Sequence, residues 1–281
     1  MGKNEVTAGL HIIATPIGNL ADISFRAVET MRSVDVLYCE DTRVTRKLLH
    51  AYQIKTPLRR YDDHTGESTR IKIAEHIIAG QAVGLCSDAG TPIIADPGFK
   101  LVRYLVDQGL PVMGVPGATA SIHALVLSGL PSDKFAFLGF PPPKKMAREQ
   151  FLRSTKAIPF TLIFYEAPHR LVEFLLSVGE IMPGRTIVVA RELTKTFEQV
   201  RRGTAQELVD FYQLYPAKGE CVVLIGPLDQ NNDRWDEDRL KEAIVNNLSA
   251  HKPRQLAHHL SEPSRWSSSE IYALITDIKK K

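Results

Sequence analysis

Short apolar runs rich in β-branched residues alternate with amphipathic segments along most of this chain. In the first half, we expect strands at residues 10–14, 34–39, 82–86 and 111–115, and helices at 24–32, 44–52, 67–79 and 99–108. Such alternation is typical of an α/β domain whose mainly parallel strands are covered on both faces. The chain is 44% hydrophobic and 24% charged, so it can bury such a core, and disordered and low-complexity classes are excluded.

The alternation is interrupted at residues 129–145, where Pro141, Pro142 and Pro143 predict a stiff surface loop. A second α/β domain is expected beyond it, with strands at 161–165, 186–191 and 221–225 and helices at 168–178 and 205–212. An acidic linker then leads to three short helices at 238–248, 254–260 and 268–278, with Pro263 between the last two. We therefore expect domains at 1–130 and 131–228, and a linker with a helical tail at 229–281.

Three loops of small residues follow expected strands of the first domain. They are Thr15–Leu20, which contains Gly18, then Ser87–Gly98, and then the segment P-G-A-T-A-S that contains Thr119. Ligands of open α/β sheets bind outside the carboxyl ends of the strands, so these loops predict a ligand cleft. The Rossmann glycine fingerprint fails after Gly18, and no P-loop motif occurs, which disfavours both kinds of nucleotide site.

The cysteines, the histidines and the lengths of the apolar stretches bear on metal binding, membrane contact and cellular compartment. Cys39, Cys86 and Cys221 are widely spaced, so we expect buried free thiols and neither a disulfide framework nor a zinc site. His258 and His259 are adjacent and point in different directions on a helix, so we expect no metal. Apolar stretches of about 18 residues and a signal peptide are both lacking. A cytoplasmic protein without membrane contact is therefore expected, and free thiols suit that compartment.

Seven segments occur in an order that resembles one known family. They are IATPIGNLADIS, DVLYCEDTRVT, SDAGTPIIADPG, VPGATASIHALVLSGLP, FYEAPHR, ARELTKTFEQVRRG and GECVVLIG. Together they resemble the ribosomal RNA small-subunit methyltransferase I family, which belongs to the tetrapyrrole-methylase-like, class III S-adenosylmethionine enzymes. The resemblance covers about residues 10–226 and extends loosely into the tail.

This resemblance implies a homodimer of two-domain α/β chains that hold S-adenosyl-L-methionine between the domains. The implied reaction methylates the ribose 2′-hydroxyl of a cytidine in the decoding region of small-subunit ribosomal RNA, either as naked RNA or in the assembled small ribosomal subunit. The implied cofactor site takes Thr15, Pro16, Ile17, Gly18, Ala89, Gly90, Thr91, Ile94, Thr119 and Ala120 from the first domain. The second domain is expected to add Tyr165 or Glu166, and Leu193 or Thr194.

Methylation of a ribose hydroxyl needs a group that takes its proton near the transition state. The charged clusters that end apolar strands contain our two candidates for this catalytic role, Lys195 and Glu166. Arg43 and Arg170 are expected to bind phosphates of the substrate. We expect the same of Lys144 and Lys145, which the proline-rich loop presents. For each charged cluster, a solvated strand end or an inter-domain salt bridge is an equally good interpretation.

Two other functions stay open at this point. A small-molecule methylase of the corrin or porphyrin type is disfavoured, because residues 134–156 hold six basic residues and one acidic residue that a macrocycle does not need. It is also disfavoured because the first loop reads T-P-I-G and the later motif Gly90-Thr91-Pro92, as in the ribosomal RNA branch. A non-catalytic RNA-binding assembly factor would keep the fold and use the tail. The net charge of +3 excludes only indiscriminate, charge-driven binding.

Overall fold

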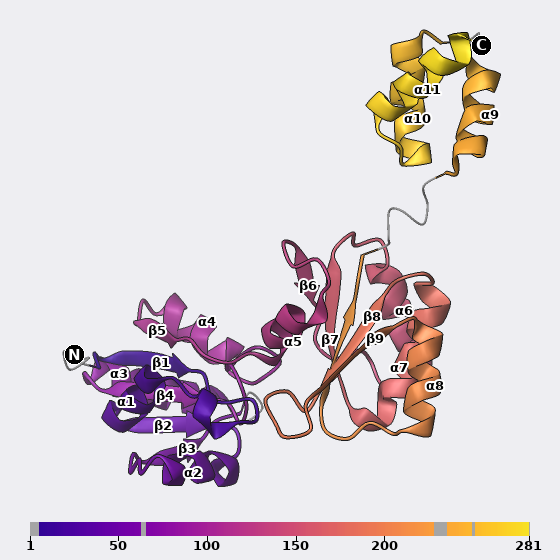
Figure 1. Ribbon diagram of the computed structural model, residues 1–281. Coiled ribbons are helices and arrows are strands. Elements are labelled where there is room, and N and C mark those ends of the chain that lie inside the picture. Colours follow the sequence, from indigo (N-terminus) through magenta and orange to yellow (C-terminus); the bar gives the residue numbers. More distant parts are fainter. Residues whose placement is uncertain (1–5, 63–65, 228–234, 249–250, 281) are drawn as a thin grey trace.

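The computed structural model describes residues 6–62, 66–227, 235–248 and 251–280. Two five-stranded sheets follow each other along the chain, and three helices form a separate bundle near the C-terminus (Figure 1). The predicted fold class, two α/β domains with a small helical region after them, is confirmed.

The first sheet is fully parallel, with strand order β3-β2-β4-β1-β5. Its strands are β1 (Gly9–Ile13), β2 (Val36–Cys39), β3 (Leu58–Arg60), β4 (Ala82–Cys86) and β5 (Val112–Val115). The central strands β2 and β4 are buried at every position. Their continuous apolar sequences therefore reflect helices packed on both faces of the sheet.

The helices of this domain lie in two layers. They are α1 (Phe25–Ser33), α2 (Thr42–Ala51), α3 (Gly66–Ile78) and α4 (Phe99–Asp107), with a short 3-10 helix η1 (Leu20–Asp22) before α1. Met31 of α1 and Leu48 of α2 pack on one face, whereas Ile73 of α3 and Leu101 of α4 pack on the other. Side-chain caps fix where α1 and α2 begin, since Ser24 and Asp41 accept backbone N–H bonds there.

This topology creates a crevice between β1 and β4. The two strands are neighbours in the sheet, but the chain leaves β1 toward the α1 layer and leaves β4 toward the α4 layer. The loops that follow the two strands therefore diverge at the carboxyl edge. Open α/β sheets bind their ligands at such a switch point.

The second sheet has the order β6-β7-β10-β8-β9 and is antiparallel except for the β6–β7 pair. Its strands are β6 (Phe135–Phe137), β7 (Thr161–Glu166), β8 (Ile187–Arg191), β9 (Gln199–Gly203) and β10 (Cys221–Ile225). One face packs against α6 (Lys145–Thr155), α7 (Leu171–Ile181) and α8 (Ala205–Leu214), with the short helix η2 (Pro168–Arg170) before α7.

Helix α5 (Ala120–Ser128) covers the other face of this second sheet (Figure 1). Ala124 and Leu125 pack there against Ile163, Val188 and Leu224. The sequence-based boundary at residue 130 assigns α5 to the first domain, whereas its packing is with the second. The chain therefore passes from one core to the other between β5 and α5, directly behind the crevice.

The C-terminal bundle contains α9 (Glu237–Asn247), α10 (Pro253–Ser264) and α11 (Ser268–Lys280). It has its own core, which includes Leu240, Leu256 and Ile271. The expectation that Pro263 lies between helices is wrong, because it lies inside the last turn of α10. The helix ends instead at Arg265, which has left-handed backbone angles. Much of the expected linker, residues 228–234, is outside the described part of the chain.

Candidate functional site

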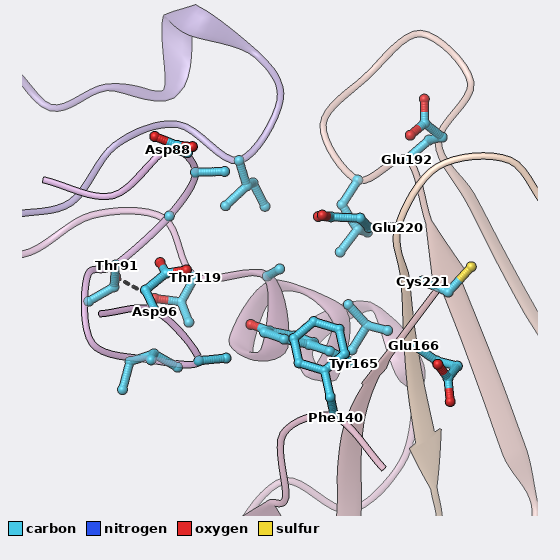
Figure 2. A pocket seen from close by; sticks show the side chains of 18 of the residues that line it. Asp88, Thr91, Asp96, Thr119, Phe140, Tyr165, Glu166, Glu192, Glu220 and Cys221 are labelled. Carbon is cyan, nitrogen blue, oxygen red and sulfur yellow. Dashed lines mark hydrogen bonds between the residues drawn. The ribbon is translucent and has the colours of Figure 1, made fainter. Parts of the chain in front are cut away.

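A cavity of about 280 Å³ lies between the carboxyl edge of the first sheet and the inner face of the second (Figure 2). Ile17 follows β1, the residues 88–91 and 94–96 follow β4, and Thr119 and Ala120 lead into α5. The opposite wall comes from the second domain, including Tyr165, Leu193 and Val222. Small-molecule sites usually have volumes of about 300–1,000 Å³, so this cavity is close to the lower end.

Hydrogen bonds hold the two loops at the switch point together. Thr15 and Gly90 exchange backbone N–H···O bonds of 2.9 and 3.2 Å. The buried Thr15 hydroxyl also donates to the carbonyl of Ser87 at 3.2 Å. Gly90 has a φ of +85°, a backbone conformation that favours glycine, and a Cβ there would lie 3.2 Å from Ile17 Cγ2. The first wall of the cavity is therefore a rigid unit.

A set of hydrogen bonds between polar groups lies along one side of the cavity and joins the two domains. The hydroxyls of Thr91 and Thr119 are 2.7 Å apart, and Thr91 also donates to the carbonyl of Ala118 at 3.0 Å. In the first turn of α5, the N–H of Ser121 donates to the hydroxyl of Tyr165 at 3.1 Å. Tyr165 therefore fixes the start of α5 against the second sheet.

The loop between β8 and β9 contacts the first domain directly. The N–H of Asn19 donates to Thr194 Oγ1 at 3.0 Å. Glu192 and Thr194 have positive φ angles of 52° and 65°, which are uncommon for residues with side chains and for a β-branched residue above all. A Cβ on Gly18 would lie 2.8 Å from the carbonyl oxygen of Leu193, so only glycine permits this close approach.

The lining of the cavity is rich in carboxylic residues, which are Glu40, Asp88, Asp96, Glu166, Glu192 and Glu220. Burial is the main cause that raises the pKa of Glu40, Asp88 and Asp96, and repulsion from neighbouring carboxylates adds to it. For Asp96 the pKa rises to about 6. A cavity with this charge favours a cationic ligand.

Most residues of the predicted cofactor site line this cavity. They are Ile17, Ala89, Gly90, Thr91, Ile94, Thr119, Ala120, Tyr165, Glu166 and Leu193. Thr15 and Pro16 are buried behind it, and Gly18 and Thr194 lie at the contact between the two loops. The structure thus brings the predicted set together, but four of its members support the wall instead of facing the cavity.

Glu166 is placed differently from our expectation of a catalytic base. Its side chain is fully buried, and its Oε1 lies 3.1 Å from Nε of Arg170 and 2.8 Å from the N–H of Ala167. Successive residues of a strand point to opposite faces, so Glu166 faces away from the side that carries Tyr165. A carboxylate with these fixed partners suits a structural role better than proton transfer, and the catalytic role of Glu166 stays a prediction.

The same contacts involve Arg170, whose role in phosphate binding stays a prediction. In addition to the ion pair with Glu166, its Nη2 donates to the carbonyl of Pro141 at 2.6 Å. The guanidinium is mostly buried and ties the loop after β6 to the loop after β7. Arg170 is thus occupied within the protein, which suits a structural role better than clamping a phosphate.

Lys195 lines the cavity and remains a candidate for contact with substrate. Its ammonium group donates to Glu192 Oε1 at 2.9 Å, and its side chain is 43% exposed. Both solvent and a carboxylate therefore reach this ammonium group. Lys195 therefore suits binding of a charged group better than removal of a proton.

The other predicted substrate-binding residues lie outside the cavity lining. Arg43 is exposed and pairs with Asp41 at 2.6 Å. Lys144 and Lys145 are exposed at the start of α6. Arg148 was counted in the same basic run, but it is buried and donates to Ser177 and to the carbonyl of Pro143. The local positive charge at the surface is therefore smaller than the sequence indicates.

Several lining residues were not predicted as site residues. Phe140 follows β6 and Glu220 precedes β10, and neither belongs to a glycine-rich loop. Asp96 belongs to the recognised loop Ser87–Gly98, and its position directly before Pro97 and Gly98 was the available signal. No sequence signal marks Phe140, since only the folded sheet places it beside the cavity.

Two absences can be stated for the described part of the chain. No group of three or more His, Cys, Asp or Glu side chains in it is arranged to hold a metal ion. None of its helices is both long and apolar enough to cross a membrane.

Comparisons with known proteins identify the family. Residues 9–209 match the family model of the Tetrapyrrole (Corrin/Porphyrin) Methylases. A protein of Erythrobacter litoralis named "Ribosomal RNA small subunit methyltransferase I" is 46% identical over 276 residues, which cover 98% of this chain and 96% of that protein. A protein of Mesorhizobium japonicum with the same name is 44% identical over 260 residues, which cover 90% and 88%.

Solved structures show the same fold at low sequence identity. Diphthine synthase matches with a TM-score of 0.61 at 15% identity, over 77% of this chain and 89% of that one. A second match is the uroporphyrin-III C-methyl transferase of Thermus thermophilus in complex with S-adenosyl homocysteine. Its TM-score is 0.53 at 18% identity, and the match covers 78% of this chain and 97% of that one. The matches confirm S-adenosyl-L-methionine as the cofactor. The chain belongs to the tetrapyrrole (corrin/porphyrin) methylase family and groups with its members named ribosomal RNA small subunit methyltransferase I.

Proposed function

We propose that this chain uses S-adenosyl-L-methionine to methylate the ribose 2′-hydroxyl of a cytidine in the decoding region of small-subunit ribosomal RNA. The observation that carries the proposal is the cavity at the switch point, in a chain that is 44–46% identical to two relatives named for small-subunit ribosomal RNA methylation. The ribose and the nucleotide come from the resemblance of the sequence motifs.

The residues around the cavity fit the proposed cofactor. A ligand with a sulfonium and an ammonium group matches the excess of carboxylates. Gly90 leaves a cradle that a Cβ would partly fill, so a flat or extended ligand can approach the backbone there. We assign the residues that hold the cofactor to Ile17, the loop 89–94, Thr119, Ala120, Tyr165 and Leu193. When bound, S-adenosylmethionine supplies an electrophilic methyl group.

We assign the proton acceptor to Asp96. Its carboxylate lies in the cavity wall (Figure 2), and its pKa, raised to about 6 by burial and neighbouring carboxylates, makes it a base that is ionised at neutral pH. A general base works best when its pKa is near the working pH, with a typical gain of about 10²–10⁴-fold. Positioning of the hydroxyl by the rigid wall adds to this.

Basic groups outside the cavity support an RNA substrate over a small macrocycle. Arg43 is 85% exposed on the first domain, Lys145 is 73% exposed on the second, and Lys144 is also exposed. Phosphate contacts of this kind position nucleic acid without reading its sequence. We include the bundle α9–α11 in the RNA-binding surface. The basic residues Lys252, Arg254 and Arg265 lie at the two ends of α10, and the core of the bundle does not depend on the two sheets.

The expected homodimer and cytoplasmic location belong to the same proposal. Ile122 and Val126, one turn apart on α5, expose 45% and 74% of their surface, and this apolar face suits a second copy of the chain. Light scattering of the purified chain tests the dimer. The cytoplasm is the compartment of the proposed substrate, and the three cysteines are free.

Methyl transfer from labelled S-adenosylmethionine tests the proposal. The substrates are small ribosomal subunits, the naked small-subunit RNA, large-subunit RNA and a porphyrin mixture. We expect label only on small-subunit RNA, free or assembled. Label on the porphyrin alone would support the corrin-type alternative, and binding of RNA without any transfer would support an assembly factor.

A further inference from the structure

Phe140 presents an aromatic ring at the edge of the cavity that the proposed cofactor and proton contacts leave unexplained. The side chain is 54% exposed, yet it contributes to the cavity lining. Its ring meets Tyr165 edge-on, with centroids 5.5 Å apart and planes at 65° (Figure 2). An exposed phenylalanine on a protein surface needs no explanation by itself. An exposed phenylalanine that borders a ligand cavity does need an explanation.

The backbone on both sides of Phe140 is anchored. The carbonyl of Gly139 accepts the N–H of Tyr165 at 3.0 Å, and the carbonyl of Pro141 accepts Nη2 of Arg170 at 2.6 Å. Pro141 is buried, and its ring fixes the backbone angle φ directly after Phe140.

The neighbouring ring is fixed as well. Tyr165 packs edge-on against Phe137, with centroids 4.9 Å apart, and its hydroxyl accepts the N–H of Ser121. The orientation of Phe140 is therefore set before any ligand binds, and little entropy is lost when a flat ligand stacks on it.

Positive charge follows Phe140 closely along the chain. Lys144 occupies the N-cap position of α6 and Lys145 is its first residue, and both are exposed, with Lys145 3.6 Å from Glu149. The partial positive charge of a helix N-terminus adds to that of the two lysines. An aromatic face with cationic groups beside it is how proteins bind unpaired nucleotides: the base stacks and the phosphate pairs.

We propose that Phe140 stacks on the unpaired base of the target nucleotide and thereby holds its ribose at the cavity. The occupant is a base of single-stranded RNA, so this inference rests on the proposed function and specifies how the substrate is held. Stacking is tolerant of sequence, so Phe140 positions the nucleotide and other contacts select it.

The test compares Phe140→Leu, which keeps an apolar side chain but loses the aromatic face, with Phe140→Tyr, which keeps that face. Binding of a single-stranded fragment of the decoding region is measured by fluorescence anisotropy in the presence of S-adenosyl homocysteine. Loss of one stacked base corresponds to about 5–150-fold weaker binding for Phe140→Leu, and Phe140→Tyr should bind like wild type. The matched control is Phe25→Leu, since Phe25 is 94% exposed on α1 and does not line the cavity.

Three outcomes would overturn the inference. The first is RNA affinity in Phe140→Leu that equals that of the control. The second is a loss of cofactor affinity, measured by calorimetry, as large as the loss of RNA affinity, which would make the ring a cofactor contact. The third is a change of oligomeric state without a change in RNA binding, which would make it a subunit contact. The binding assay needs no methyl transfer, so a failure of the proposed reaction is recognised separately, as wild-type protein that binds RNA without labelling it.

Discussion

Replacement of Gly18 by alanine tests a close contact between the two domains. A Cβ at this position would lie 2.7 Å from Lys195 Cγ, 2.8 Å from the carbonyl oxygen of Leu193 and 2.8 Å from Thr194 Oγ1. Real Cβ atoms do not approach other atoms this closely, and the Leu193 oxygen is backbone, so the loop between β8 and β9 must move. Overpacking of this kind costs about 1–3 kcal/mol.

That movement displaces Leu193 and Lys195, which line the cavity. We therefore expect Gly18→Ala to weaken S-adenosylmethionine binding by about 5–150-fold in titration calorimetry, the equivalent of the same free energy. Gly114→Ala is the matched control, because no atom lies within 4 Å of a Cβ there and the effect should be close to zero. The reasoning fails if Gly18→Ala binds the cofactor as tightly as this control and melts at the same temperature.

Three further predictions concern single groups around the cavity. Tyr165→Phe leaves the N–H of Ser121 without its partner, at a cost of about 1–3 kcal/mol, and should lower the melting temperature; an unchanged melt contradicts this. Asp96→Asn should melt higher than wild type at pH 7.5, because the pKa raised to about 6 means that ionisation opposes folding. This destabilisation by the ionised Asp96 is absent below the ordinary carboxyl pKa, near pH 4, and is complete above pH about 6. Equal melting temperatures of the two proteins at pH 7.5 would refute it. Methylation by the wild type should fall below pH 6. Lys144→Ala should remove about one phosphate contact and so reduce the slope of log RNA affinity against log salt concentration. Arg148→Met, which removes a buried guanidinium, should lower only the melting temperature. Equal salt slopes for the two variants would contradict that distinction.

The parts of the fold that the sequence predicted are those buried on both sides. Strands β4 and β10 are buried at all their positions, so their sequences are continuous apolar runs that stand out from polar neighbours. The loops after β1, β4 and β5 were recognisable for a related reason. Backbone geometry requires glycine at positions such as Gly90, and that requirement is visible in the residue type.

The elements that sequence patterns missed lie at sheet edges or depend on distant contacts. Strand β3 contains two arginines and β9 has the sequence QVRRG, because an edge strand needs only one buried side. Helix α6 begins at Lys145, two residues after the three prolines, and no helix was predicted between that loop and the strand at 161–165. The antiparallel order of the second sheet was not predicted, since a strand's own sequence says little about the direction of its neighbour.

Charged residues were the least predictable part of the candidate site. The sequence places Glu166 and Arg170 in one polar cluster, but only the folded structure shows that the two groups pair with each other and that the carboxylate is fully buried. Arg148 and Arg185 count as surface charge in the sequence, yet both are buried and donate hydrogen bonds. Charge counts along a chain do not reveal which groups the fold neutralises.

The central claim is that this cavity directs a methyl group onto a ribose oxygen of small-subunit ribosomal RNA. Small-subunit RNA is treated with the purified chain and S-adenosylmethionine, digested to nucleosides and analysed by mass spectrometry, which separates a methylated ribose from a methylated base. The account predicts one new 2′-O-methylcytidine, with production strongly reduced by Asp96→Asn. Methyl groups found only on bases, or no gain over RNA incubated without the protein, would contradict it.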